Sequence, residues 1–193
     1  MSNHTESPSA LEVADKLASR LESLGSDYAF GGAIALAFWI NPRATVDVDV
    51  TLFLDPTKPT AVLQCLGQLG CDFDLEKSVS LLREHGFCHA KLDGRQVDVF
   101  LPNTPFYEAA RSRRVRRRLI ETEAWVWDAA TLSVFKLMFF RQKDFVDVVQ
   151  MLRVQGSLLD RDWVRDQLES ICGCRDPRLA QWDELIADAE SPL

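Results

Sequence analysis

Residues 31–53 read GGAIALAFWINPRATVDVDVTLF. Two glycines open this stretch, an apolar run follows them, and a proline at position 42 would end a helix formed by residues 33–40. Residues 45–54 then alternate, with apolar side chains at even positions and Asp47 and Asp49 among the odd ones. Because side chains on a strand point alternately to its two sides, the pattern predicts a strand that carries both carboxylates on one face.

The aspartates of this strand have the spacing of a metal site. Asp47 and Asp49 would lie roughly 6.6 Å apart along the strand, and they would repel each other unless a cation or a donor compensates them. Asp98 lies within a later predicted strand and offers a third carboxylate. Mg²⁺ prefers such oxygen ligands, and two ions can promote displacement at phosphorus. We therefore expect Asp47, Asp49 and Asp98 to bind Mg²⁺ or Mn²⁺, although an isolated pair of this kind is more often a solvated strand face.

The glycine pair precedes a predicted helix. Gly31 and Gly32 would let backbone N–H groups approach a phosphate at the helix N-terminus, which favours negative charge. A tight turn is the common alternative for two glycines in this position. We expect them to contribute to nucleotide binding only if the carboxylates form the adjoining metal site.

The rest of the chain predicts an α+β fold, because strands dominate its middle and helices its last third. Asp93-Gly94 predicts a tight hairpin turn. We expect three parts: a disordered tail at 1–10, a core at 11–127 and a C-terminal helical region at 128–193. Strands are expected at 28–30, 45–54, 87–92, 96–101 and 116–126. Helices are expected at 11–24, 33–40, 60–69, 75–84, 105–110 and from 131 onward, with breaks near 156 and at 172–177.

Composition restricts the environment. The 193 residues carry a net charge of −7, so the surface as a whole does not attract nucleic acid. The first ten residues lack the apolar segment of a signal peptide, and the chain has no apolar run long enough to span a membrane. Five cysteines without a CxxC pair indicate free thiols in a reducing compartment, with a zinc site as the alternative. We expect a cytoplasmic protein without a membrane partner.

The stretch at 31–53 resembles the motif of the DNA polymerase β-type nucleotidyltransferase superfamily. The arrangement of Arg43, Thr45, Asp47 and Asp49 looks most like that of the bacterial abortive-infection nucleotidyltransferase toxins, and antibiotic nucleotidyltransferases carry similar patterns. VDVF at 97–100 is similar to the strand that bears the third carboxylate of the superfamily. The resemblance implies a nucleotidyltransferase core, with a mixed β-sheet flanked by helices, and a small C-terminal helical region.

A later segment, 132–147, resembles the helical motif of the same toxins. The resemblance implies catalytic and metal-binding roles for Asp47, Asp49 and Asp98. It also implies that an NTP such as ATP is bound by Gly31, Gly32, Arg43, Thr45, Lys136 and Asp144. Without the resemblance, Lys136 could equally extend from a helix edge, and Asp144 could belong to a surface ion-pair set.

Six arginines lie between positions 111 and 118. A basic patch in an acidic chain could guide RNA or another polyanion to the metal site, so Arg113, Arg114 and Arg116 are candidate acceptor-binding residues. A solvated helix end and strand start is the alternative.

Three functions are compatible with the sequence. The first is an enzyme that transfers a nucleoside monophosphate from an NTP to a hydroxyl of RNA, protein or a small molecule. It could act in a toxin–antitoxin or phage-defence system with an antitoxin partner. The second is a catalytically silent binding module with the same fold, or an antitoxin partner itself. The third is an antibiotic nucleotidyltransferase.

Overall fold

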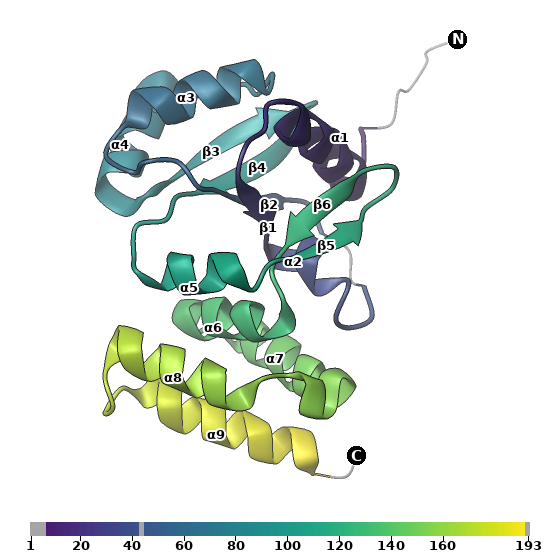
Figure 1. Ribbon diagram of the computed structural model, residues 1–193, viewed down its shortest axis with the longest axis vertical. Coiled ribbons are helices and arrows are strands. Elements are labelled where there is room, and N and C mark those ends of the chain that lie inside the picture. Colours follow the sequence, from purple (N-terminus) through teal and green to yellow (C-terminus); the bar gives the residue numbers. More distant parts are fainter. Residues whose placement is uncertain (1–6, 43–44, 192–193) are drawn as a thin grey trace. The chain divides into compact units, whose positions relative to one another are not determined.

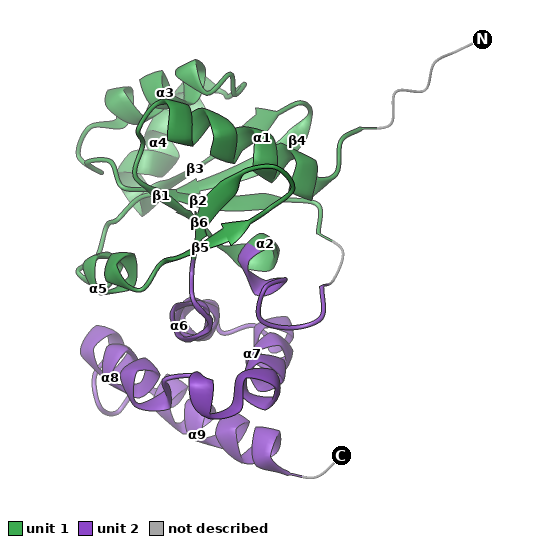
Figure 2. Cartoon of the chain, turned by 45° about the vertical axis from the view of Figure 1, so that its right-hand side comes forward, with its two compact units in different colours: residues 1–34, 43–126 green, residues 35–42, 127–193 purple. Residues whose placement is uncertain are grey.

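The computed structural model describes residues 7–42 and 45–191, which divide into two compact units (Figures 1 and 2). Unit 1 comprises residues up to 34 together with 43–126, and unit 2 comprises 35–42 and 127–193. Unit 1 contains α1 (Ala10–Ser23), β1 (Tyr28–Phe30), β2 (Val48–Leu52), α3 (Pro59–Gln68), α4 (Leu75–His85), β3 (Phe87–Leu92), β4 (Arg95–Phe100), α5 (Phe106–Ser112), β5 (Val115–Arg118) and β6 (Glu123–Val126). Helix α2 (Gly32–Leu36) crosses the division.

The strands of unit 1 form one mixed sheet in the order β3-β4-β2-β1-β6-β5. The β2–β4 and β1–β6 pairs are parallel, and the other neighbouring pairs are antiparallel. Val48, Val50 and Leu52 are buried on one face, and α1 packs against β2 and β6. Figures 1 and 2 show α1, α3 and α4 along one side of this sheet. The predicted α+β class with a mixed sheet flanked by helices is confirmed.

Unit 2 is a group of helices around its own apolar core. It contains α6 (Ala129–Phe139), α7 (Gln142–Gln155), a 3₁₀ turn (Gly156–Leu158), α8 (Arg161–Cys172) and α9 (Pro177–Glu190). Val148, Leu168 and Trp182 are almost fully buried between these helices. The predicted breaks near 156 and at 172–177 are confirmed. No helix within the described ranges is both long and apolar enough to cross a membrane.

The part of the chain that the structure describes begins before residue 10, where the predicted tail would end. Residues 1–6 lie outside the described residues. Ser9, however, caps α1, because its hydroxyl accepts the N–H of Glu12 while Glu12 accepts the N–H of Ser9 at 2.7 Å. This reciprocal capping box fixes the first turn of α1.

Two of the predicted elements are shorter than expected. The predicted strand 45–54 is reduced to β2, Val48–Leu52, whose pairing with β4 begins at Val48 and Val97. The predicted helix 33–40 ends at Leu36. The following segment is held by tertiary hydrogen bonds within unit 2, from Trp39 Nε1 to the carbonyl of Trp127 at 2.9 Å and from Gln155 Nε2 to the carbonyl of Trp39 at 2.7 Å.

The prediction of a single strand at 116–126 is wrong, because the chain folds there into the hairpin of β5 and β6.

The turn between β5 and β6 is held by Asp15 of α1. One carboxylate oxygen of Asp15 accepts the backbone N–H groups of Ile120, Glu121 and Thr122 at 3.0, 3.0 and 2.9 Å. Burial alone would raise the pKa of Asp15, but these three bonds and the Thr122 hydroxyl together lower it below its usual value. Three consecutive amides converging on one anion thus stabilise a turn that has no glycine or proline.

Replacing Asp15 by alanine should lower the free energy of unfolding by about 1–3 kcal/mol at neutral pH, because three N–H groups lose their acceptor. The pKa of Asp15 is lower in the folded protein than in the unfolded chain. Its contribution to the free energy of unfolding is therefore fully present above the ordinary pKa of about 3.9, and it is lost as pH falls through the folded pKa. Denaturant titrations should therefore show the difference from wild type shrinking below that pH. Asp183→Ala, which breaks an exposed ion pair with Arg165, is the control and should have a smaller effect. An Asp15→Ala difference that stays constant down to pH 2 would contradict the assignment.

Candidate active site

Unit 1 contains a row of residues that crosses the three strands β3, β4 and β2 and ends at the glycine turn after β1. Asp49 of β2 and Asp98 of β4 are register partners on adjacent parallel strands. His89 of β3 is in turn the antiparallel partner of Asp98. At the other end of the row, the N–H of Gly31 donates to the carbonyl of Asp49 at 2.9 Å. The sheet therefore brings two carboxylates from distant parts of the sequence side by side, next to the glycine turn.

Gly32 lies directly against the carboxylate of Asp49. Its φ is +50°, a left-handed conformation that favours glycine. A Cβ added at Gly32 would lie 1.8 Å from Asp49 Oδ2 and 2.6 Å from its Cγ. The glycine is thus required for the close approach of the turn to the carboxylate. Whether Gly31 and Gly32 also bind nucleotide phosphates stays a prediction.

Asp47 lies one residue before β2 and is half-buried. Its carbonyl accepts the hydroxyl of Thr45 at 3.1 Å, which braces the backbone between these residues. Arg43, for which the resemblance implies nucleotide binding, lies outside the described residues. Asp47 therefore lies just before the strand that carries Asp49, rather than within it as predicted.

Asp98 projects from the face of β4 opposite the fully buried Val97 and Val99, and its side chain is 18% exposed. Its Oδ1 lies 2.6 Å from Nδ1 of His89 and accepts Nε2 of Gln96 at 2.8 Å. Two donors on one oxygen fix the orientation of the carboxylate.

His89 is a member of this site that the sequence reasoning did not assign. The signal was nevertheless present, because a two-residue hairpin turn fixes the register of its strands. Asp93 and Gly94 both have positive φ, of 51° and 82°, and their turn pairs Leu92 with Arg95. Counting three residues outward from that pair along each strand places His89 opposite Asp98.

The donor set of this site fits a hard cation. Asp47, Asp49 and Asp98 offer oxygen ligands alone, which Mg²⁺ and Mn²⁺ accept. Within the described residues, no group of three or more carboxylate, histidine or cysteine side chains is placed close enough to hold an ion by itself. Mg²⁺ is commonly bound through one or two carboxylates, with water and substrate phosphates completing its shell. The pair formed by Asp49 and Asp98 meets that requirement.

Comparison with known proteins shows what the overall fold resembles. No protein-family model matches the chain, and no curated protein matches its sequence. Among solved structures, the antibiotic-resistance factor ANT(2'')-Ia is similar with a TM-score of 0.52 at 9% identity, over 92% of this chain and 89% of that one. An antigenic nucleotidyltransferase-like protein from Paracoccidioides brasiliensis aligns with a TM-score of 0.47 at 16% identity, over 89% of this chain and 93% of that one. The chain therefore shares the overall fold of ANT(2'')-Ia.

The arginines at 111–118 contact acidic and aromatic side chains of unit 1. Arg114 is paired with Asp27, donates to the carbonyl of Tyr28 at 2.7 Å, and its guanidinium lies 4.9 Å from the centre of the Phe53 ring. Arg116 is paired with Glu22 at 2.6 Å and lies 5.1 Å from the Trp125 ring centre. Arg113 caps the C-terminus of α5. These contacts give Arg114 and Arg116 structural roles, and acceptor binding by Arg113, Arg114 and Arg116 stays a prediction.

Lys136 and Asp144 belong to a buried charged cluster in unit 2. Lys136 Nζ lies 2.6 Å from Oδ2 of Asp147 and 3.6 Å from Oδ1 of Asp144. Asp144 also accepts Nε of Arg141 at 2.5 Å. Lys136, Asp144 and Asp147 are each less than a tenth exposed. Because an unpaired buried charge is costly, mutual compensation explains why these groups occur together. The nucleotide-binding role of Lys136 and Asp144 stays a prediction.

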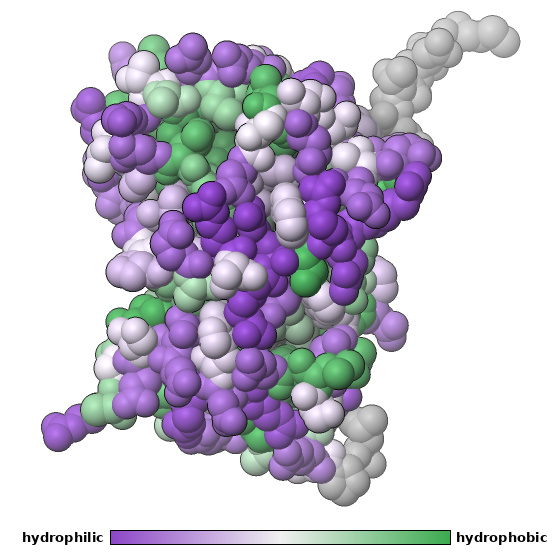
Figure 3. Space-filling model, viewed as in Figure 1, coloured by the Kyte–Doolittle hydropathy of each residue, from purple (hydrophilic) through white to green (hydrophobic). Residues whose placement is uncertain are grey.

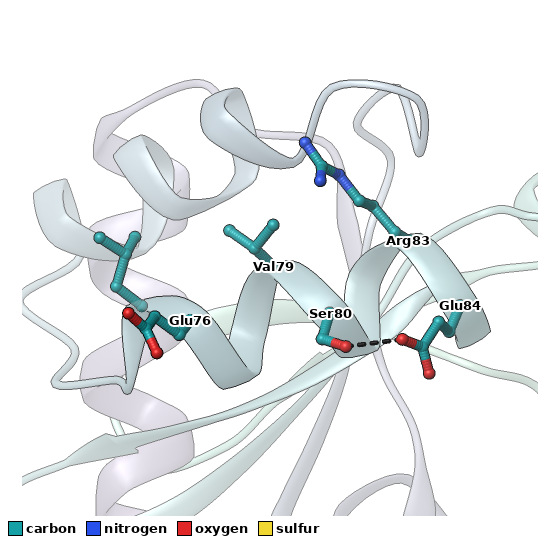
Figure 4. Close-up of a pocket in the computed structure, with 6 residues that line it drawn as sticks. Glu76, Val79, Ser80, Arg83 and Glu84 are labelled. Carbon is teal, nitrogen blue, oxygen red and sulfur yellow. Dashed lines mark hydrogen bonds between the residues drawn. The ribbon is translucent and has the colours of Figure 1, made fainter.

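A surface hollow lies away from the carboxylate row. It has a volume of about 450 Å³ and is formed along α4 by Leu75, Glu76, Val79, Ser80, Arg83 and Glu84, with Ser80 donating to Glu84 at 2.6 Å (Figure 4). Figure 3 shows apolar surface in the region where Figure 1 places α3 and α4. The hollow contains none of the predicted site residues, and we assign it no role in the proposed chemistry.

Proposed function

We propose that this chain is a metal-dependent nucleotidyltransferase, which transfers a nucleoside monophosphate from an NTP to a hydroxyl acceptor in the cytoplasm. The observation that carries the proposal is the register pairing of Asp49 with Asp98, beside a glycine turn that closes on Asp49. The likeness of the fold to that of ANT(2'')-Ia supports it.

Each carboxylate has a role in this proposal. Asp47 and Asp49 hold Mg²⁺ or Mn²⁺ together with the triphosphate, and Asp98 joins them in holding a second ion. When bound, the ions neutralise the phosphate charge and stabilise the leaving oxygen. Asp98 also orients the acceptor hydroxyl and accepts its proton. The acceptor oxygen forms a bond to the α-phosphorus, the bond from that phosphorus to the bridging oxygen breaks, and pyrophosphate leaves with the electron pair.

Two classes of molecule are candidates for the hydroxyl acceptor. The likeness of residues 43–49 to the abortive-infection toxins favours RNA or protein, and a setting beside an antitoxin. A hydroxyl-bearing antibiotic is the second candidate, because one similar solved structure is that of an antibiotic-resistance factor. The pairing of Arg114 with Asp27 and of Arg116 with Glu22 offsets positive charge that would repel a cationic drug.

The test uses the four NTPs labelled at the α-phosphate, with Mg²⁺ or Mn²⁺ and a panel of tRNA, proteins and antibiotics. Wild type should release pyrophosphate and transfer the label to one acceptor class. Asp98→Ala should keep much of the NTP affinity but lose transfer by about 10²-fold or more, the scale of a general-base or charge-positioning role.

Asp183→Ala, an exposed carboxylate of unit 2, is the control and should transfer at the wild-type rate. Equal transfer by wild type and Asp98→Ala would remove Asp98 from the site. If wild type binds NTP but transfers to no acceptor, a non-catalytic binding module becomes the better description.

A further inference from the structure

We propose that His89 is a positioning residue, which holds the carboxylate of Asp98 in the orientation needed to bind the second metal ion. This inference rests on the proposed function, because it assigns a role to a neighbour of the metal site. It goes beyond that function by adding a residue that the motif does not contain.

The contact is direct and is fixed by the fold. His89 and Asp98 are register partners on β3 and β4, and Nδ1 lies 2.6 Å from Oδ1. The ring of His89 meets Phe87 edge to face, with centroids 5.3 Å apart. Phe87 in turn packs against its register partner Phe100, and their ring centroids lie 6.1 Å apart. The imidazole is therefore held on one side by an aromatic neighbour while its nitrogen faces the carboxylate.

The hydrogen bond has a chemical consequence. A carboxylate on a strand rotates broadly about its last torsion, so its two oxygens exchange places unless one of them is held. His89 and Gln96 both engage Oδ1, which fixes the plane and directs Oδ2 to a single orientation. Hydrogen-bonding partners of ligating groups orient those groups in this way. The contact requires the imidazole tautomer that carries its proton on Nδ1.

Two substitutions separate positioning from packing. His89→Asn keeps an N–H donor near the place of Nδ1 but loses the ring, and asparagine is unfavourable in strands. His89→Phe keeps the ring and suits a strand but loses the donor. A packing role predicts that the phenylalanine variant resembles wild type, whereas a positioning role predicts that the asparagine variant does.

The measurement is Mn²⁺ binding followed by electron paramagnetic resonance, with a non-hydrolysable NTP analogue at saturation. Wild type should bind a second Mn²⁺, and Asp98→Ala should lose that step. His89→Phe should weaken the second step by about tenfold, and His89→Asn by less than about threefold. Melting temperatures should follow the opposite order, with His89→Phe above His89→Asn.

Equal second-step affinity in wild type and His89→Phe would overturn the inference and leave the proposed function standing. The inference would also be overturned if the variant with the higher melting temperature bound the second Mn²⁺ more tightly. If wild type itself binds no Mn²⁺ with the analogue, the inference falls together with the metal site.

Discussion

Replacing Asp49 by asparagine should abolish Mg²⁺-dependent NTP binding and leave the protein folded. Asp49 lies at the centre of the row, between Asp98 on β4 and the glycine turn. An amide has nearly the shape of the carboxylate, so it fits the same space beside Gly32, but it lacks the negative charge that a divalent ion requires. Calorimetric titration with a non-hydrolysable NTP analogue, with and without Mg²⁺, measures the loss.

Asp183→Asn makes the same chemical change on an exposed carboxylate of unit 2 and should bind the analogue as wild type does. Circular dichroism melting should show that both variants remain folded. Unchanged Mg²⁺-dependent affinity in Asp49→Asn would rule out Asp49 as a metal ligand.

Gly32→Ala should remove both nucleotide binding and transfer, because the new methyl group would occupy the space of the Asp49 carboxylate. The added Cβ would lie 1.8 Å from Oδ2, so either Asp49 or the turn must move. A non-glycine residue in the left-handed region also costs roughly 1–2 kcal/mol. We expect a lower melting temperature and loss of Mn²⁺-dependent analogue binding.

Gly25→Ala is a matched control. Gly25 has a similar φ of +62°, but a Cβ there would meet nothing within 4 Å. Gly25→Ala should lower the free energy of unfolding by roughly 1–2 kcal/mol, because alanine is also unfavourable in the left-handed region. It should keep nucleotide binding. If Gly32→Ala binds the analogue as well as Gly25→Ala does, the close approach of Gly32 to Asp49 has no role in the site.

Local patterns were sufficient for much of the fold. The alternation around Val48 and Val50 predicted β2, and Asp93-Gly94 predicted the hairpin whose strands the structure contains. The turn between β5 and β6 could not be predicted in this way. It has no glycine or proline, and the carboxylate that holds its N–H groups comes from Asp15, in a helix near the start of the chain. Tertiary contacts of this kind leave no periodic signal.

The sequence proposed the carboxylates of the candidate site but not their geometry. Asp49 and Asp98 were expected to converge, yet nothing in the sequence fixes which strands pair or in which register. The parallel pairing of β2 with β4 decides that. Likewise, the pairing of Lys136 with both Asp144 and Asp147 could not be predicted from the sequence. Their burial follows from helix packing in unit 2 rather than from local composition.

The strand order of unit 1 has a consequence for the order of folding. The partners His89 and Asp98 meet across a tight hairpin, and hairpins of this kind form within microseconds. Asp49 joins them by a parallel pairing that closes a much longer loop, and such non-local contacts form more slowly. We therefore expect the β3–β4 half of the row to be assembled first and Asp49 to dock onto it late. If the proposed metal site is correct, metal affinity should appear only as the whole sheet closes, and a nascent or partly unfolded chain should not bind the nucleotide.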